Sequence, residues 1–345
     1  MARTIYTRRI QRTGGSTFVV SLPKAWIRRA GLGSGSILYI EEELDGSLRV
    51  YPYRREATVE YHRKIIVDPG LSTGNVIREV ISSYLAGYTS VEVEFSPNSS
   101  VDREKLKRII ESSIIGFNVI EETPGRILFY NVAYPSNLPL FKALGNAFRV
   151  SLSMLNDCIS GLKRSDKELL KSVGERDDLV DKLYMLVVRQ LNEVLLGRRN
   201  PRDLGLESLP ETLYVFLGAK SIERVADHAT LIASHGSATV ERGVPEAIVE
   251  ALEDATEIFD KSARSFIYLN KEGAMKVALL VEEFWDKQRE LLRKLNTSHS
   301  PETVYFIVDS IRRIAGYSLD LAESVIDIVT IRMAEKEQKR QESSY

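Results

Sequence analysis

The sequence lacks several features that define common protein classes. It has a single cysteine, Cys158, in 345 residues, which excludes an intrachain disulfide framework and a multi-cysteine zinc site. No apolar run approaches the roughly 18 residues that a membrane-spanning helix needs. The N-terminus lacks the apolar core of a signal peptide. These absences predict a cytoplasmic protein without membrane insertion.

Acidic residues are missing from the first part of the chain. Residues 1–40 contain seven Arg and Lys and no Asp or Glu. Residues 1–55 carry a balance of +6, although the net charge of the whole chain is −1. The rest of the chain is therefore mildly acidic. A basic end on an acidic body indicates different partners for the two parts.

Changes in residue pattern divide the chain into three domains. The length exceeds what one compact core usually organises, so a multidomain protein is expected. Residues 1–56 have the pattern of short strands and one short helix, with a hairpin signal at Asp45-Gly46. The order β-α-β-α-β-β over residues 57–135 predicts a small α/β domain resembling the ferredoxin-like class. From 138 to 345 strand patterns are absent, which predicts an all-helical domain.

The helical domain contains an internal repeat. Residues 221–233 align without a gap with residues 310–322, at an offset of 89. Ser, Ile, Arg and two Ala recur in place. Two three-helix units that cannot bury their apolar faces alone are expected to share a core. Turn residues place the six expected helices at roughly 139–164, 167–197, 209–236, 245–271, 273–296 and 301–340.

Three of these helices carry two carboxylates four residues apart. This spacing puts both side chains on the same helix face, where like charges repel by a few tenths of a kcal/mol. A bound cation removes the repulsion, and oxygen ligands suit hard cations such as Mg²⁺, Mn²⁺ or iron. A single pair is more often an ordinary solvated surface, but two pairs on adjacent helices of a repeat favour a site. The pairs are Asp177/Asp181, Glu223/Asp227 and Glu282/Asp286.

The segment Ile-Glu-Arg-Val-Ala-Asp-His-Ala at 222–229 resembles the signature helix of the PhoU family of phosphate-signalling regulators. The acidic run at 175–181 resembles the partner helix of that family, and the helix order and repeat match over roughly 138–340. The resemblance implies two three-helix bundles that bind metal ions through Glu/Asp-x-x-x-Asp motifs. It also implies regulation of phosphate uptake through a phosphate transporter and its sensor kinase. The implied ligands of a Mg, Mn, Fe or Zn ion are Asp177, Asp181, Glu223 and Asp227, with Glu175 or Asp178 nearby.

The second repeat departs from this pattern. Arg312 and Gly316 stand where the first repeat has its carboxylate pair. A cationic arginine in place of a ligand disfavours a metal ion. The pair Glu282/Asp286 survives, but it could instead form a salt bridge with Arg312. We therefore expect one well-formed metal site in the first repeat and a degenerate second one.

Residues 8–26 resemble the AbrB/SpoVT/MazE class of swapped-hairpin domains. That class has a basic strand, Gly-Gly-Ser, a strand ending in Leu-Pro-Lys, a short helix, Leu-x-x-Gly and a further strand, and the match covers about residues 3–55. The resemblance implies a homodimer of interleaved hairpins, and many such domains bind DNA. A doubled basic surface supplies affinity for DNA phosphates that falls steeply with salt. The candidate DNA contacts are Arg8, Arg9, Arg12, Lys24, Arg28 and Arg29.

Together these features predict a phosphate-responsive regulator that is not an enzyme. Its N-terminal dimer would bind DNA, and its helical domain would bind metal. The alternative is an adaptor that acts only on proteins such as a phosphate transporter or sensor kinase. In that case the basic domain would only dimerise or dock on the acidic helical domain. A bundle-type metal enzyme is disfavoured because such sites use Glu-x-x-His ligands, which are absent at 175–181, 223–227 and 282–286.

Overall fold

A computed structural model describes residues 5–42, 47–52, 60–132, 138–239, 243–296 and 302–342. The chain divides into two units, Met1–Val59 with Gln341–Tyr345, and Glu60–Arg340. No helix in the described ranges is long and apolar enough to cross a membrane.

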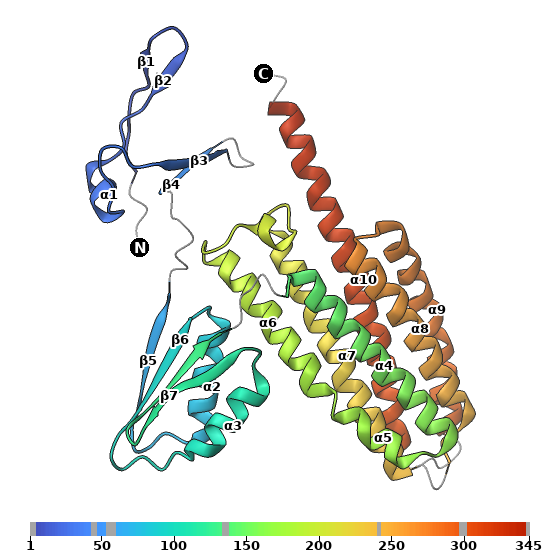
Figure 1. Ribbon diagram of the computed structural model, residues 1–345. Coiled ribbons are helices and arrows are strands. Elements are labelled where there is room, and N and C mark those ends of the chain that lie inside the picture. Colours follow the sequence, from blue (N-terminus) through green and yellow to red (C-terminus); the bar gives the residue numbers. More distant parts are fainter. Residues whose placement is uncertain are drawn as a thin grey trace. The chain divides into compact units, whose positions relative to one another are not determined.

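The N-terminal unit consists of two small hairpins and one short helix (Figure 1). The elements expected from the sequence are present, while the turn predicted at Asp45-Gly46 lies outside the described residues. Over residues 5–40 and 47–52 no side chain is buried. The described part of this unit therefore has no core of its own. Antiparallel pairs form between β1 (Gln11–Thr13) and β2 (Thr17–Val19) and between β3 (Leu38–Glu42) and β4 (Leu48–Pro52), and α1 spans Lys24–Arg29.

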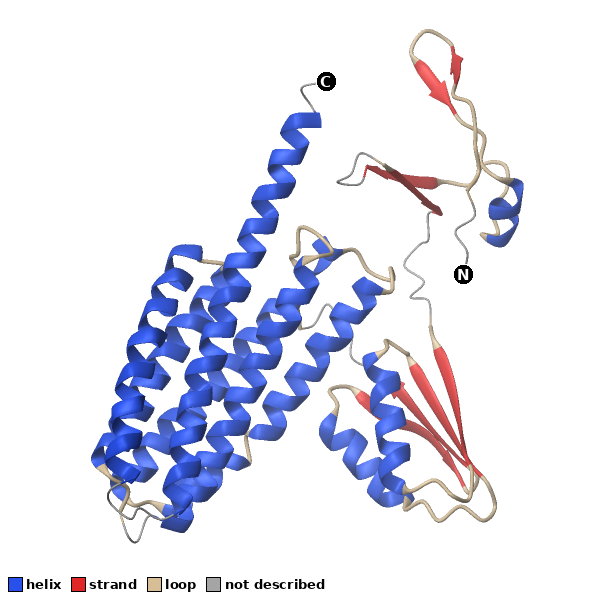
Figure 2. Cartoon of the chain, turned by 180° about the vertical axis from the view of Figure 1, so that it is seen from behind, coloured by secondary structure: helices blue, strands red, loops and turns tan. Residues whose placement is uncertain are grey.

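The second unit begins with a two-layer α/β domain. Two helices cover one face of a four-stranded sheet of order β5-β6-β8-β7, as Figures 1 and 2 show. β5 and β6 are parallel and the other pairs are antiparallel. The side chains of Ser72 and Asp102 cap the two helices by accepting backbone N–H bonds. The elements are β5 (His62–Val67), α2 (Thr73–Leu85), β6 (Ser90–Phe95), α3 (Arg103–Ser113), β7 (Phe117–Thr123) and β8 (Arg126–Asn131).

The predicted order β-α-β-α-β-β is confirmed. The ferredoxin-like class has the order β-α-β-β-α-β, whereas here two strand–helix units precede a final hairpin. The resemblance therefore holds for the layers and not for the connections. The core between them contains the rings of Tyr84, Phe117 and Phe129, all at most 1% exposed.

The remainder of the second unit is a helical domain, in which the structure describes seven α-helices where the sequence predicted six (Figure 1). The helix expected over 167–197 is in fact two helices, because the chain turns at Glu175 and Arg176. Arg176 anchors this turn to the helix over residues 140–164 by an ion pair of 2.6 Å with Asp157 and a hydrogen bond of 2.9 Å to Ser153. The helices are α4 (Leu140–Arg164), α5 (Lys167–Gly174), α6 (Asp177–Leu195), α7 (Glu211–Thr239), α8 (Glu246–Tyr268), α9 (Lys271–Asn296) and α10 (Glu302–Glu342), with a 3₁₀ turn, η2, at Pro201–Leu204.

The sequence repeat corresponds to buried positions on α7 and α10. The recurring serines, Ser221 and Ser310, are each 4% exposed, and the recurring isoleucines and alanines are also buried. These apolar residues belong to one continuous core that spans both halves of the helical domain. The repeat thus preserves the residues through which the halves pack together.

Side chains from the C-terminal part of α6 form hydrogen bonds with the α/β domain. Arg189 donates hydrogen bonds to the carbonyl oxygens of Tyr84 and Tyr88, at 2.6 and 2.9 Å. Asn192 donates to the carbonyl of Leu85 at 2.8 Å, and the residues after α6 add a similar bond. The carbonyls of Tyr84 and Leu85 belong to the last turn of α2, where carbonyl groups have no partner within the helix. A cationic side chain at a helix C-terminus is also favoured by the helix dipole.

Candidate metal site

Three carboxylates converge where α6 packs against α7. Asp181 comes from α6, and Glu223 and Asp227 come from α7, where their four-residue spacing places them one turn apart. One oxygen atom of each lies within 4.8 Å of the others. This is a separation at which a single cation can be bound by all three.

The hydrogen-bonding of these carboxylates is incomplete. Glu223 is only 8% exposed, and its Oε2 atom is buried without a hydrogen-bond partner. The Oδ1 atom of the neighbouring Asp177 is in the same state. Lys220, one turn before Glu223, donates to the other oxygen of Glu223. A buried oxygen without a donor costs about 1–3 kcal/mol, and coordination of a cation would offset that cost.

Burial and mutual repulsion raise the pKa values of the aspartates in and beside the cluster. Burial, and then the charges of Glu223, Asp177 and Asp181, raise the pKa of Asp227 to about 7. Burial and the charges of Asp181 and Glu223 raise the pKa of Asp177 to about 6. The pKa of Asp181 is also raised, first by burial and then by Glu223. Without a cation the cluster therefore holds protons near neutral pH, and an ion would displace them.

Two further residues from the acidic run do not join the cluster. Glu175 lies in the turn between α5 and α6, and Asp178 lies about 100° around α6 from Asp177. Both side chains are exposed. Of the six residues proposed from the sequence, three converge, Asp177 lies beside them, and Glu175 and Asp178 face solvent.

The second repeat has no comparable cluster among the described residues. Glu282 and Asp286 are exposed on α9, and Asp286 pairs with Arg289. The salt bridge anticipated for Arg312 is not formed with either carboxylate. Arg312 pairs instead with Asp309 at 3.4 Å. That partner is three residues away on the same helix, a spacing at which side chains are neighbours.

Lys220 is a member of the cluster that the carboxylate pattern did not reveal. It pairs with Glu223, and its Nζ atom lies 4.9 Å from the ring centre of Tyr184. Its spacing of three residues before Glu223 was a usable signal, since side chains at i and i+3 are neighbours on a helix.

All six cations proposed for DNA binding are exposed in the N-terminal unit. Lys24, Arg28 and Arg29 lie on α1. Arg12 also has a structural role, since its Nε donates to the carbonyl of Gly15 at 3.0 Å across the β1–β2 hairpin. Gly14 in the same turn has a φ of +67°, a conformation that favours glycine.

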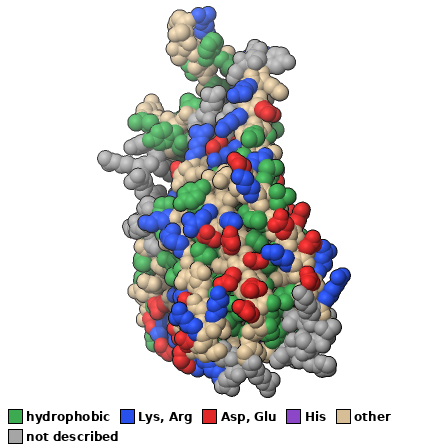
Figure 3. Space-filling view, turned by 90° about the vertical axis from the view of Figure 1, so that its right-hand side faces the viewer, with side chains coloured by type: hydrophobic (Ala, Val, Ile, Leu, Met, Phe, Trp, Pro, Cys, Tyr) green, Lys and Arg blue, Asp and Glu red, His purple; other side chains and the backbone are tan. Residues whose placement is uncertain are grey.

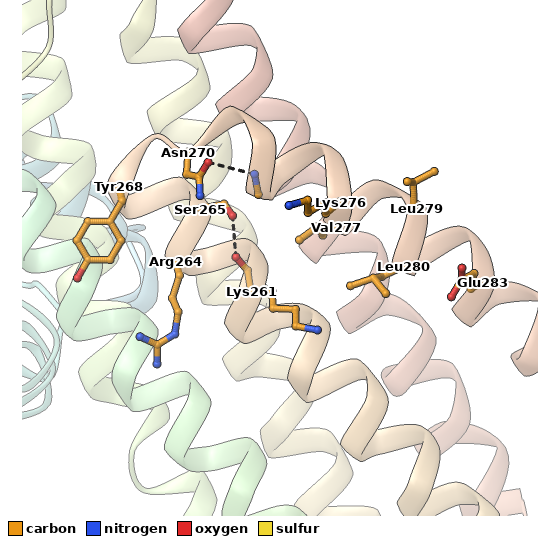
Figure 4. Close-up of a pocket in the computed structure, with 11 residues that line it drawn as sticks. Lys261, Arg264, Ser265, Tyr268, Asn270, Lys276, Val277, Leu279, Leu280 and Glu283 are labelled. Atoms are coloured by element: carbon orange, nitrogen blue, oxygen red, sulfur yellow. Dashed lines mark hydrogen bonds between the residues drawn. The ribbon is translucent and has the colours of Figure 1, made fainter.

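A cavity of about 630 Å³ lies elsewhere, between α8 and α9 (Figure 4). Tyr268, Val277 and Leu280 contribute apolar surface to it. Each of its cations is paired within its own helix, as in the 2.8 Å contact of Arg264 with Asp260. Figure 3 shows basic and acidic side chains interspersed on this side of the helical domain. The cavity contains none of the proposed metal ligands.

Comparison with known proteins gives two family matches. The sequence matches the PhoU domain over residues 144–235, the stretch that includes the carboxylate cluster. It matches the family described as antidote-toxin recognition MazE, bacterial antitoxin, over residues 11–58. No curated protein matches significantly.

Two solved structures resemble the chain. PhoU from Pseudomonas aeruginosa is 20% identical with a TM-score of 0.50, and the match covers 55% of this chain and 95% of that one. The phosphate transport system regulatory protein PhoU from Streptococcus pneumoniae is 15% identical with a TM-score of 0.44, covering 55% and 93%. The first likeness supports the fold of the helical domain. This chain thus contains a PhoU domain over residues 144–235 and a MazE-like domain over residues 11–58.

Proposed function

We propose that the protein is a phosphate-responsive regulator, not an enzyme, that binds DNA and a metal ion through separate domains. The observation that carries the proposal is the combination, in one chain, of a PhoU domain and a basic MazE-like domain. The phosphate part of the proposal comes from the PhoU family, whose members regulate phosphate uptake. A domain that responds to a solute and a domain that binds DNA form a minimal transcriptional regulator.

The metal part of the proposal rests on Asp181, Glu223 and Asp227, with Asp177 as a neighbouring fourth carboxylate. All the ligand atoms are oxygens, which favours Mg²⁺, Mn²⁺ or iron over Zn²⁺, because zinc is typically bound by sulfur and nitrogen ligands. Bound metal would neutralise the charge that raises these pKa values and would supply partners for the unpaired oxygens.

Elemental analysis of the purified protein tests this site. We expect the double variant Asp181→Ala plus Asp227→Ala to lose the metal found in the wild type. The control variant Glu282→Ala plus Asp286→Ala removes an exposed pair with the same spacing and should leave the metal content unchanged. Equal metal content in all three proteins would refute the proposed site.

The dimer part of the proposal rests on the missing core of the N-terminal unit. Phe18, Val20 and Ile40 are 69%, 52% and 65% exposed. Folded monomers rarely leave such a share of their large apolar residues in water. A second copy that interleaves its hairpins would bury them, and it would double the six exposed cations.

A gel shift on the protein's own upstream DNA tests the DNA part. We expect a specific shift that weakens steeply as salt rises, and that is lost with Arg8→Ala plus Arg9→Ala. The matched control is Arg108→Ala plus Arg164→Ala, which removes two exposed cations from the second unit. The adaptor alternative predicts no specific shift together with an intact dimer.

A further inference from the structure

A second groove, of about 440 Å³, lies among α6, α7 and α10. One side is apolar and is contributed by Tyr184 of α6 and by Tyr214, Phe216 and Leu217 of α7. The other side is acidic and comes from α10. The groove is distinct from the metal ligands, although Lys220 contacts both.

The apolar side forms an exposed stripe. Phe216 is 38% exposed and Leu217 is 44% exposed, and Leu213, one turn earlier, is 56% exposed. Positions i, i+3 and i+4 share one helix face. The other face of α7 is buried in the core of the domain. An apolar stripe on the outer face of a buried helix is a feature of interaction surfaces.

The acidic side consists of Asp320, Glu323 and Asp327. They follow the spacing i, i+3, i+7 and are exposed on one face of α10. Within the described part of the chain, none of the three forms an ion pair. Their mutual repulsion would be relieved by a cationic occupant.

Two cations also line the groove, but each is already engaged. Lys220 pairs with Glu223. The guanidinium of Arg224 lies 5.4 Å from the ring centre of Tyr317, and its charge acts on Asp320. Glu323 and Asp327 therefore retain an uncompensated negative charge. The cavity between α8 and α9 has no such uncompensated charge of one sign, since each of its cations pairs with a carboxylate of its own helix.

We propose that this groove binds an amphipathic helix of a partner protein, with an apolar stripe against α7 and Lys or Arg side chains facing α10. The stretches 213–220 and 320–327 are each about 10 Å long at 1.5 Å per residue, the length of two turns of a bound helix. Helix-in-groove recognition uses apolar anchors at this spacing, with flanking charges that set orientation. The inference is independent of the metal and DNA proposals.

The test uses a fluorescein-labelled helical peptide of 14 leucine and lysine residues, titrated with the full chain and followed by anisotropy. We expect binding that weakens with salt, and no binding of the matched peptide that has glutamate in place of lysine. Phe216→Ser plus Leu217→Ser, and separately Glu323→Lys plus Asp327→Lys, should each weaken binding about tenfold, or about 1.4 kcal/mol. The control Glu250→Lys plus Glu282→Lys changes two exposed carboxylates elsewhere and should alter affinity less than about twofold. Circular dichroism confirms that each variant is folded.

Three outcomes overturn the proposal. The first is that the wild-type chain does not bind the lysine peptide, or that both groove variants bind it with the same affinity as the wild type. The second is a photo-crosslinking version of the peptide that attaches outside residues 213–220 and 320–327. The third is a change of oligomeric state in the unliganded Phe216→Ser plus Leu217→Ser variant, which would assign the groove to a second copy of this chain.

Discussion

Replacing two charges of the carboxylate cluster should stabilise the metal-free protein and abolish its response to metal. Asp181→Asn plus Asp227→Asn keeps the size of both side chains and removes their charge. In the native state the pKa of Asp227 is raised from 3.8 to about 7. A raised carboxyl pKa means that the folded state binds the proton more tightly than the unfolded chain does. The associated stability is present below about pH 4 and is lost as pH rises to about 7.

The expected magnitude is modest because the cluster is half exposed. A shift of about three units corresponds to roughly 4 kcal/mol for a fully buried group. Solvent screening reduces this for half-exposed carboxylates, so we expect the double variant to gain about 1–2 kcal/mol at pH 8. For a domain of this size that is a rise in Tm of about 2–8 °C. At pH 4 the gain should disappear, because the aspartates are then protonated.

The affinity for metal should rise with pH, whereas the stability of the metal-free wild type should fall. The ion must displace protons from Asp177 and Asp227, whose pKa values are about 6 and about 7. Apparent affinity for Mn²⁺ should therefore fall by about 100-fold between pH 7.5 and pH 5.5. In the wild type at pH 7.5, Mn²⁺ at about 100 times its Kd should add about 2.7 kcal/mol of stability.

Thermal unfolding with and without Mn²⁺ at pH 4, 5.5, 7.5 and 8, combined with calorimetric titration, measures both effects. The control is Glu282→Gln plus Asp286→Asn on α9, which should change neither quantity. A double variant that is less stable than wild type at pH 8 without metal would refute the account of repulsion. A double variant that still binds Mn²⁺ like the wild type would refute the site itself.

Three further predictions concern packing and the contact between domains. Glu211 is 0% exposed and pairs with Arg332 at 2.8 Å, so Arg332→Met should cost about 3–5 kcal/mol in denaturant unfolding; adding Glu211→Gln should recover part of that loss. A Cβ at Gly218 would lie 2.2 Å from Phe266, so Gly218→Ala should cost about 1–3 kcal/mol despite the higher helix propensity of alanine, and Phe266→Leu should rescue it. Arg189→Ala removes two bonds to the end of α2 and should speed amide hydrogen exchange there, with exchange in α8 as the internal control.

Local patterns were sufficient for most of the architecture. Helix extents, turns and the repeat follow from apolar periodicity and from Gly and Pro, because these depend on neighbours within a few residues. The turn at Glu175 and Arg176 was not predicted although Gly174 directly precedes it, because no Pro marks it and Leu170, Val173, Val180 and Leu183 keep the spacing of a single helix face. Its contacts are with Asp157 and Ser153, which lie on α4.

Sequence spacing also could not separate ligands from bystanders. Asp177, Asp178 and Asp181 are equivalent by residue type, but the packing of α6 on α7 turns Asp181 toward Glu223 and leaves Asp178 in solvent. The prediction of a degenerate second site rests on Arg312 and Gly316, which are visible in the repeat. The partner of Arg312 could not be predicted, since several carboxylates were within reach along the chain.

The sequence by itself determined the basic N-terminal unit, the helical repeat and the pairs of carboxylates one turn apart. These are properties of residue type and spacing, and chain geometry translates them directly into faces of helices. Tertiary structure alone decided which carboxylates meet and how deeply they are buried. It also placed Lys220, which pairs with Glu223, beside the cluster. It also decided that Leu213, Phe216 and Leu217 remain exposed opposite the carboxylates of α10. Burial and convergence depend on contacts between segments far apart in the chain, which local periodicity does not encode.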